Sequence, residues 1–513
     1  MKKYLRAVLL VLLIMVMLAA PCSALSKNYD YMYDGKGQSY SAPVSFVVDG
    51  VYSGIDMGTT PLYSPQDLYV HNDGTIYIAD TRNNRIVILN SELQFQREIL
   101  EYVEVVTSKN EETGEETTEE VVTQLNKPEG VFYGPDNLLY ICDTENKQVV
   151  AVDISGDRAM VVKKDDGSEI VAVNKNIEFK PQKVAVDKEL TIYVVSSNIY
   201  QGILQYDKDL NFESFFAPNE VEVTAAVRLR AMWREFFSEE QGSYMQMTLP
   251  LPYNNIFMSR ENLIYTTAIA VPIGDEIKCL NAVGKNILIT PESLAGEVAF
   301  GDREYIMDGT TTVSNQFVDV HCDENGIMTA LDQYKNRIFQ YDQDCNLICI
   351  FGGYGSAKGQ FTRPVAIEKI NDKYIVLDAA TNSITTFVAS EYIESVYEAL
   401  SYYSEGKYSE SVDLWENVLK VNNNYTTAYR SIGRAYLQQG RYTEAMEMLK
   451  EGNDKYFYSL ALKEYRKEYT RQNMWWMVIV LVAVLVGVVK GTKRLRFWLQ
   501  SQPFPKKSKR KKG

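Results

Sequence analysis

One short pattern of apolar and polar residues recurs along the chain. In its first copy, alternating apolar residues run from Pro65 to His71, a polar turn follows, and a second apolar stretch ends at Asp80. Alternation on both sides of a short turn predicts an antiparallel β-hairpin. Five more copies follow, beginning near Pro128, Pro181, Pro252, Val318 and Pro364.

A third apolar stretch follows the hairpin in several copies, as at Ile86–Leu89, Val149–Val152 and Ile338–Tyr341. A unit of this kind cannot bury both of its faces alone, so several units must pack around a common axis. Six copies therefore predict a mainly β fold, a six-bladed β-propeller over residues 40–388.

Four copies end their second strand with an aspartate that an asparagine soon follows. These aspartates are Asp80, Asp143, Asp332 and Asp378. Because such side chains satisfy backbone donors in turns, we expect a structural role for them. The stretches Asp80–Ile86 and Asp332–Ile338 resemble the signature of NHL repeats, although the third and fourth copies lack the aspartate. The resemblance covers roughly residues 40–387 and implies the propeller fold rather than a particular function.

Three inserts interrupt the repeats, at residues 101–122, 157–173 and 219–241. Residues 101–120 hold eight glutamates and one lysine between valine-rich stretches, which predicts a long acidic hairpin. A calcium loop is the alternative, but no Asp-x-Asp-x-Asp spacing supports it. The second insert is expected to be a hairpin that turns at Asp166–Gly167. In the third, residues 224–241 predict an amphipathic helix, either a lid on the propeller or a partner-docking element.

From about Ser390 the apolar spacing changes to the period of a helix. Five positions from Ala399 to Ser411 recur thirty-four residues later, from Gly433 to Ala445. Small residues at helix crossings and a Gly-x-Tyr turn at this period resemble tetratricopeptide (TPR) repeats. We therefore assign residues 390–472 to TPR-like helices and a capping helix. The resemblance implies a concave groove that binds a protein partner in the membrane or at the cell surface; a rigid stalk is the alternative.

The two ends of the chain predict export and anchoring. Residues 1–24 join basic residues, an uncharged stretch and small residues, as a secretory signal does. Residues 474–490 predict a single transmembrane helix, led by two tryptophans. From Lys490 onward there are ten Lys or Arg and no acid, so the positive-inside rule places the tail, residues 491–513, in the cytoplasm. The rest of the chain is then expected outside the membrane.

Charge limits the partners. The whole chain carries −14, although three basic residues lie near its start and ten in its tail, so the part between them carries −27. Such an acidic ectodomain argues against nucleic acid and anionic lipid as its ligands. The five cysteines outside the signal are odd in number and scattered, which does not indicate a disulfide framework, and the state of Cys345 and Cys349 stays open.

Candidate chemistry is sparse. The two histidines, His71 and His321, take equivalent places at the ends of first strands, which predicts a repeated turn role. A histidine zinc site needs about three ligands, and no Gly-x-Ser-x-Gly elbow is present. We therefore assign no catalytic residue and no metal ligand, and the binding residues stay unknown. Calcium held by carboxylates alone in the propeller channel is an open alternative.

The favoured interpretation is a non-enzymatic, membrane-anchored binding or scaffold protein. NHL propellers joined to TPR helices resemble membrane-anchored proteins of Gram-positive bacteria, and this implies an accessory role beside carbohydrate importers of the ABC type. The alternative is a metal-dependent, lactonase-like propeller hydrolase or lyase that acts on a sugar-derived substrate.

Overall fold

The computed structural model describes residues 30–34, 37–109, 116–173, 178–218, 252–269, 275–288, 300–302, 306–308, 311–313 and 315–501. The predicted secretory signal, the predicted helix at residues 224–241 and the tail beyond residue 501 lie outside these ranges.

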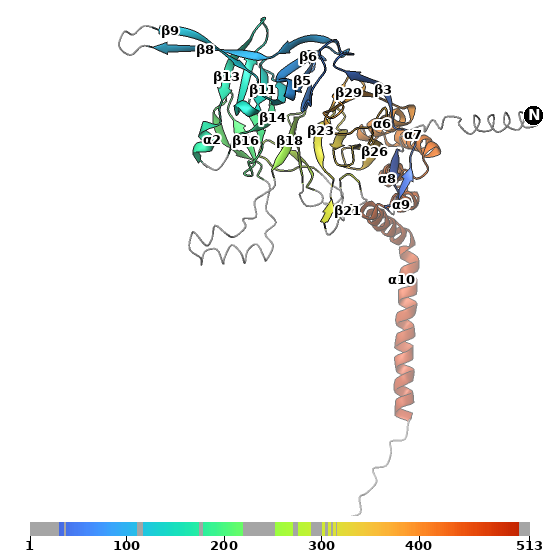
Figure 1. Cartoon of the computed structure of the whole chain (residues 1–513). Helices are drawn as coiled ribbons and strands as arrows, with labels where there is room; N and C mark the ends of the chain where they lie inside the picture. The colour runs from blue at the N-terminus through green and yellow to red at the C-terminus, as the bar shows by residue number, and fades with distance from the viewer. Residues whose placement is uncertain are drawn as a thin grey trace, which may run out of the picture. The chain divides into compact units, whose positions relative to one another are not determined.

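A six-bladed β-propeller is the main domain, as the repeats predicted (Figure 1). Each blade is an antiparallel sheet whose first strand lies innermost. Blade 1 consists of β4 (Asp67–Val70), β5 (Ile76–Asp80), β6 (Arg85–Leu89) and β7 (Phe95–Ile99). Blade 2 consists of β10 (Pro128–Tyr133), β11 (Leu139–Asp143), β12 (Gln148–Asp153) and β13 (Ala159–Asp165). Blade 3 consists of β14 (Pro181–Val186), β15 (Ile192–Ser196), β16 (Ile203–Tyr206) and β17 (Phe212–Phe216).

The remaining blades follow the same order. Blade 4 has three described strands, β18 (Tyr253–Met258), β19 (Ile264–Ala268) and β20 (Ile277–Leu280). Blade 5 consists of β23 (Phe317–Cys322), β24 (Met328–Asp332), β25 (Arg337–Tyr341) and β26 (Leu347–Gly352). Blade 6 consists of β27 (Pro364–Ile370), β28 (Lys373–Asp378), β29 (Ser383–Ala389) and, as its outer strand, β3 (Phe46–Ser53). Two short hairpins lie outside the blades: β1 (Tyr31–Tyr33) with β2 (Ser39–Ser41), and β21 (Ile306–Asp308) with β22 (Thr311–Val313).

The ring closes through strand β3, which comes from the N-terminal side of the first blade. It pairs antiparallel with β29, from Ser383 opposite Ser53 to Ala389 opposite Phe46. A propeller whose last blade borrows a strand from the start of the chain joins its two ends by backbone hydrogen bonds, so the blades cannot separate without breaking that pairing.

The repeated aspartates have the structural role expected of them. Asp80 Oδ1 accepts the backbone N–H of Tyr63 at 2.7 Å, and Asp143 Oδ1 accepts that of Asn126 at 2.8 Å. The residue after each of these aspartates reaches the next blade: Thr81 Oγ1 donates to the carbonyl of Pro128. Each carboxylate therefore ties a strand end to the start of its own blade, while its neighbour holds the adjacent blade.

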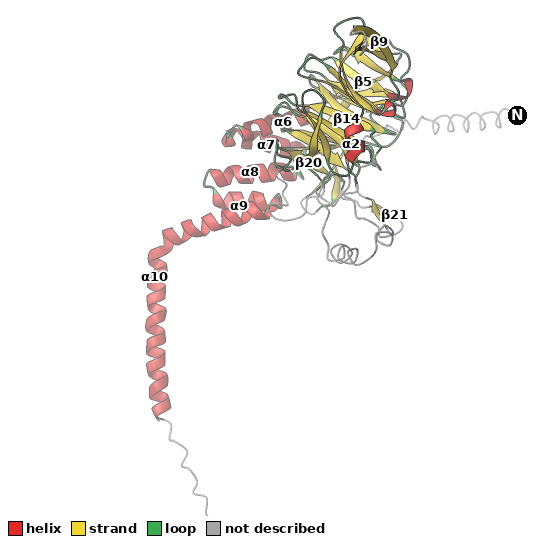
Figure 2. Ribbon diagram, turned by 90° about the vertical axis from the view of Figure 1, so that its left-hand side faces the viewer, coloured by secondary structure: helices red, strands yellow, loops and turns green. Residues whose placement is uncertain are grey.

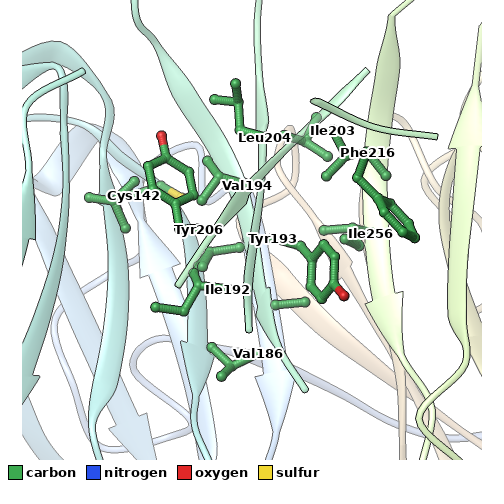
Figure 3. Packing of buried hydrophobic residues seen from close by; sticks show 14 of the residues in the cluster. Cys142, Val186, Ile192, Tyr193, Val194, Ile203, Leu204, Tyr206, Phe216 and Ile256 are labelled. Atoms are coloured by element: carbon green, nitrogen blue, oxygen red, sulfur yellow. The ribbon is translucent and has the colours of Figure 1, made fainter. Parts of the chain in front are cut away.

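Apolar side chains fill the space between neighbouring blades. Figure 3 shows part of this core around blade 3, where Val194 and Tyr206 lie near Cys142 of blade 2, and Tyr193 lies near Ile256 of blade 4. The five cysteines that the structure describes are all buried thiols. Desolvation raises the pKa of the Cys142 thiol, so this cysteine behaves as a small apolar residue.

Two of the inserts can be compared with the structure. Strands β8 (Glu101–Lys109) and β9 (Glu116–Gln124) confirm the acidic hairpin, which extends the sheet of blade 2. The hairpin expected at Asp166–Gly167 is wrong. Strand β13 is the fourth strand of its blade, and the chain turns at Gly167 into a short helix, α2 (Ser168–Val173), with Ile170 buried in the core.

The helical module follows directly (Figure 2). It contains α6 (Glu391–Ser404), α7 (Tyr408–Val421), α8 (Thr426–Gln438), α9 (Tyr442–Glu451) and α10 (Lys455–Ser501). The first hairpin belongs to the same compact unit as the propeller, which ends at Ala428. Tyr397 of α6 donates to Gln340 Oε1 of blade 5 at 2.7 Å, and Tyr425 donates to the carbonyl of Ile348 at 3.0 Å. Helix α6 and the loop that follows α7 are therefore fastened to blade 5.

Helix α10 joins the predicted capping helix and the predicted span into one element of 47 residues. It is the one helix of the described chain that is long and apolar enough to cross a membrane. Its apolar side chains between Met474 and Val489 are exposed, as expected of a surface that faces lipid rather than a protein core.

The close approach of inner strands β10 and β14 predicts the effect of one substitution. A Cβ atom at Gly130 would lie 2.3 Å from the carbonyl oxygen of Gln182, a backbone atom that cannot easily move. We expect Gly130→Ala to lower the free energy of unfolding by about 1–3 kcal/mol. Gly156→Ala is the control, since a Cβ there meets nothing within 4 Å. Equal urea midpoints for the two variants would contradict the prediction.

Candidate functional site

The inner strands of the six blades present one equivalent position each. In five blades this position lies two residues after the start of the pairing with the second strand, and in blade 1 it begins that pairing. We call the six residues there the channel ring: Asp67, Gly130, Lys183, Asn255, Asp319 and Ala366.

The polar members of the channel ring satisfy one another. Lys183 Nζ pairs with Asp67 Oδ1, and Asn255 Nδ2 donates to Asp319 Oδ1 at 2.6 Å. The other carboxylate oxygens accept backbone N–H groups: Val131 donates to Asp67 Oδ2 at 2.9 Å, and Ile367 to Asp319 Oδ2 at 2.6 Å. All four side chains are buried. Because both carboxylates bind groups of neighbouring blades, the ring fastens the blades together at the axis.

Burial and charge set the ionisation of this ring. Desolvation raises the pKa of Asp319 to about 7, although Lys183 acts against the rise. Desolvation favours neutral Lys183, but the charges of Asp67 and Asp319 outweigh it and raise the pKa of the lysine. Lys183 therefore keeps its charge at neutral pH and supplies the cation that these carboxylates require.

The two histidines make different contacts. His321 Nδ1 lies 2.8 Å from Glu368 Oε2, and its ring packs beside Phe257. Burial raises the pKa of Glu368, and the contact with His321 lowers it in part. The backbone N–H of His71 donates to the carbonyl of Thr75 in a hairpin turn, while its ring packs on Tyr133. The turn role is seen for His71, whereas the side chain of His321 pairs with an acid of blade 6.

Little space remains at the centre of the propeller. The cavity lined by the four polar ring residues and Glu368 has a volume of about 30 Å³, enough for one or two water molecules. Pockets for small organic ligands usually measure about 300–1,000 Å³. Among the described residues, no group of three or more His, Cys, Asp or Glu side chains is arranged to hold a metal ion. Calcium in the channel stays a prediction.

The sequence motifs did not mark the channel residues Asp67, Lys183, Asn255, Asp319 and Glu368. A positional signal was present, because the ring residues follow Pro65, Pro128, Pro181 and Pro364 at the same offset of two. The six positions hold five different residue types, however, so no motif marks the set. The side chains of the channel ring join neighbouring blades. The small cavity leaves no room for a substrate beside the carboxylates. This geometry does not favour the hydrolase alternative.

Removing one charge from the ring should be costly. We expect Lys183→Met to lower the free energy of unfolding by about 3–5 kcal/mol, because Asp67 then keeps a buried charge without its partner. The double variant Asp67→Asn with Lys183→Met removes both charges and should recover most of the loss. Urea denaturation measures both, and a double variant less stable than the single one would contradict this account.

Asp319 should make stability depend on pH. Its pKa rises on folding from 3.8 to about 7, so the folded state binds more protons than the unfolded state across that interval. The contribution of Asp319 to the free energy of unfolding is therefore full below pH 3.8 and lost as the pH rises towards 7. Asp319→Asn should flatten this slope in urea titrations at successive pH values, and an unchanged slope would contradict the assignment.

Comparisons with known proteins agree with the two repeat types. The NHL repeat family matches residues 62–89, and the TPR repeat family matches residues 399–440. No curated protein matches the chain. A streptogramin B lyase structure is 11% identical with a TM-score of 0.38, covering 68% of this chain and 100% of the lyase. A calcium-binding regucalcin from Agrobacterium tumefaciens is 10% identical with a TM-score of 0.37, covering 67% and 93%. Likenesses this distant carry no argument about chemistry. The chain thus carries NHL repeats in its propeller and a TPR repeat in its helical module.

Proposed function

We propose that the protein is a non-enzymatic binding and scaffold protein, anchored in a membrane by α10, with its propeller and TPR helices on the extracytoplasmic side. The repeats support a role in protein–protein interaction in general. The channel ring favours surfaces over the propeller centre as the place of that interaction, since the cavity at the axis holds only one or two waters.

The observation that carries the proposal is the β8–β9 ribbon, residues 101–109 with 116–124. Strand β8 meets β13 only through Tyr102 and Val103, so the ribbon continues beyond the blade with two strands alone (Figure 1). An isolated two-stranded ribbon is marginally stable in water, and its outer edge offers unpaired backbone groups. The ribbon thus has the form of a site to which a partner adds a strand.

The side chains of the ribbon agree with this role. Four valines stand exposed on it, two on each face: Val105 and Val122, Val106 and Val121. Exposed apolar clusters rimmed by charge are typical of interaction sites. Glu104 and Glu120 are paired with Lys164 and Arg158 of β13 and the preceding loop.

Charge selects the kind of partner. Residues 101–120 hold eight glutamates and one lysine. A second copy of this chain, at −14, would meet the ribbon with like charge. The partner is therefore a basic protein with an extended segment free to pair.

The proposed orientation of the chain in the membrane follows from its charged residues. Ten basic residues follow the apolar part of α10, and the positive-inside rule assigns them to the cytoplasm. The resemblance to anchored NHL and TPR proteins extends the proposal to an accessory role beside carbohydrate importers of the ABC type. In that role the TPR helices would contact the membrane partner.

Photo-crosslinking in native membranes tests the proposal. A photoreactive residue at position 121 of the ribbon should form a crosslink to one basic protein, which mass spectrometry identifies. The same residue at position 162, an exposed valine of β13 outside the ribbon, is the matched control and should not. Glu119→Lys should weaken the crosslink from position 121, because it reverses a charge that faces the partner. Crosslinks to copies of this chain alone, or equal products from both positions, would contradict the proposal.

A further inference from the structure

Two arginines occupy the same position in the repeat but make different contacts. Arg85 opens β6 in blade 1, and Arg337 opens β25 in blade 5. In blade 1, Arg85 Nε lies 2.7 Å from Asp80 Oδ2, and its Nη1 lies 2.7 Å from Glu98 Oε2. These two carboxylates neutralise Arg85 and bury it.

Arg337 has neither of these partners. Ile350 stands on β26 where the register of blade 1 puts Glu98. The Oδ2 atom of Asp332, the counterpart of the Asp80 oxygen, has no hydrogen-bond partner among the described residues. No carboxylate of the described residues forms an ion pair with Arg337. Asp30 interacts with this guanidinium through its charge alone.

The guanidinium of Arg337 instead lies at the wall of a pocket. Its central carbon is 4.7 Å from the ring centroid of Tyr31, and Nη1 donates to the carbonyl of Gly352 at 2.9 Å. The other N–H groups of the fork remain for a ligand. The β1–β2 hairpin closes one side of the pocket, which is the role of a hairpin that no blade contains.

The pocket measures about 660 Å³, within the range of small-ligand sites. Its lining is Tyr31, Ser39, Asp302, Tyr334, Lys335, Arg337 and Tyr354. Asp302 Oδ2 accepts Lys335 Nζ at 2.8 Å and the Tyr31 hydroxyl at 2.9 Å. The Asp302–Lys335 ion pair lies in the same lining as Arg337, whose guanidinium supplies a positive group at the pocket wall.

Aromatic rings form its rim. Tyr354 is 72% exposed and Tyr334 is 39% exposed, which is unusual for tyrosines that only fill a core. Tyrosine faces pack well against flat or ring-shaped ligands, and a guanidinium binds a carboxylate through two parallel hydrogen bonds. The pocket therefore combines a ring-binding wall with a carboxylate-binding group.

We propose that this pocket binds a small carboxylate attached to a six-membered ring, with the carboxylate on Arg337 and the ring against the tyrosines. An acidic sugar and an aromatic acid share this chemistry. The site is separate from the β8–β9 ribbon and does not depend on the scaffold role proposed above.

Titration calorimetry of the full chain in detergent tests the assignment with four probes: glucuronate, 4-hydroxybenzoate, glucose and inorganic phosphate. At least one of the two ring carboxylates should bind, and the one that binds more tightly identifies the ring type. Glucose and phosphate should bind at least about tenfold more weakly, because each lacks half of the chemistry. No binding of either carboxylate, or equally tight binding of glucose or phosphate, would overturn the proposal.

Variants separate ligand contact from folding. Arg337→Gln should weaken the carboxylate that binds by about tenfold or more, and Arg337→Lys should restore only part of the affinity, since a lysine cannot bind in two-point fashion. Tyr354→Ala should weaken the same ligand severalfold while leaving thermal unfolding unchanged, because the ring is largely exposed. Arg82→Gln is the matched control, an exposed arginine over Tyr63 in blade 1. Equal affinity of wild type, Arg337→Gln and Tyr354→Ala would overturn the assignment.

Discussion

The antiparallel pairing of β3 with β29 is the contact on which the rest of the structure depends. It joins residues more than three hundred positions apart and turns a row of blades into a closed ring. Only in a closed ring do six inner strands converge, so that Asp67 of blade 1 can meet Lys183 of blade 3 across the axis. The channel ring is therefore a product of closure, and its ion pair and hydrogen bonds in turn hold the inner strands where closure puts them.

The repeat places the same residues in several blades, but the neighbouring side chains decide which contacts those residues make. Asp80 and Arg85 satisfy each other within blade 1. In blade 5, Ile350 stands in place of the glutamate, Asp332 Oδ2 has no hydrogen-bond partner among the described residues, and Arg337 lies over the ring of Tyr31. The β8–β9 ribbon is a second local departure, since it lengthens one blade into a two-stranded edge. Both proposed contact surfaces arise where a blade departs from the repeat.

The sequence predicted those features that depend on local periodicity. Alternation and the recurring aspartates predicted the propeller, valine-rich stretches around glutamates predicted the ribbon, and the thirty-four-residue period predicted the TPR helices. It missed β3, because that strand belongs to no copy of the repeat and is recruited from a distance. It also misjudged Asp166–Gly167, where Ile170 finds a place in the core and the chain becomes helical. The channel ring could not be predicted, because its six members share a position in the repeat but no common residue type.

We propose that side chains of the propeller close its own axis and that binding occurs at the surface. Native-state hydrogen exchange tests it at two amides that lie in the channel, those of Val131 and Ile367, which donate to Asp67 and Asp319. If the channel is sealed, both amides should exchange only through global unfolding, with a free energy of exchange equal to that from denaturation. Exchange of these amides through local opening, at a much lower free energy than global unfolding, would mean that solvent and ligands reach the axis and would contradict the account.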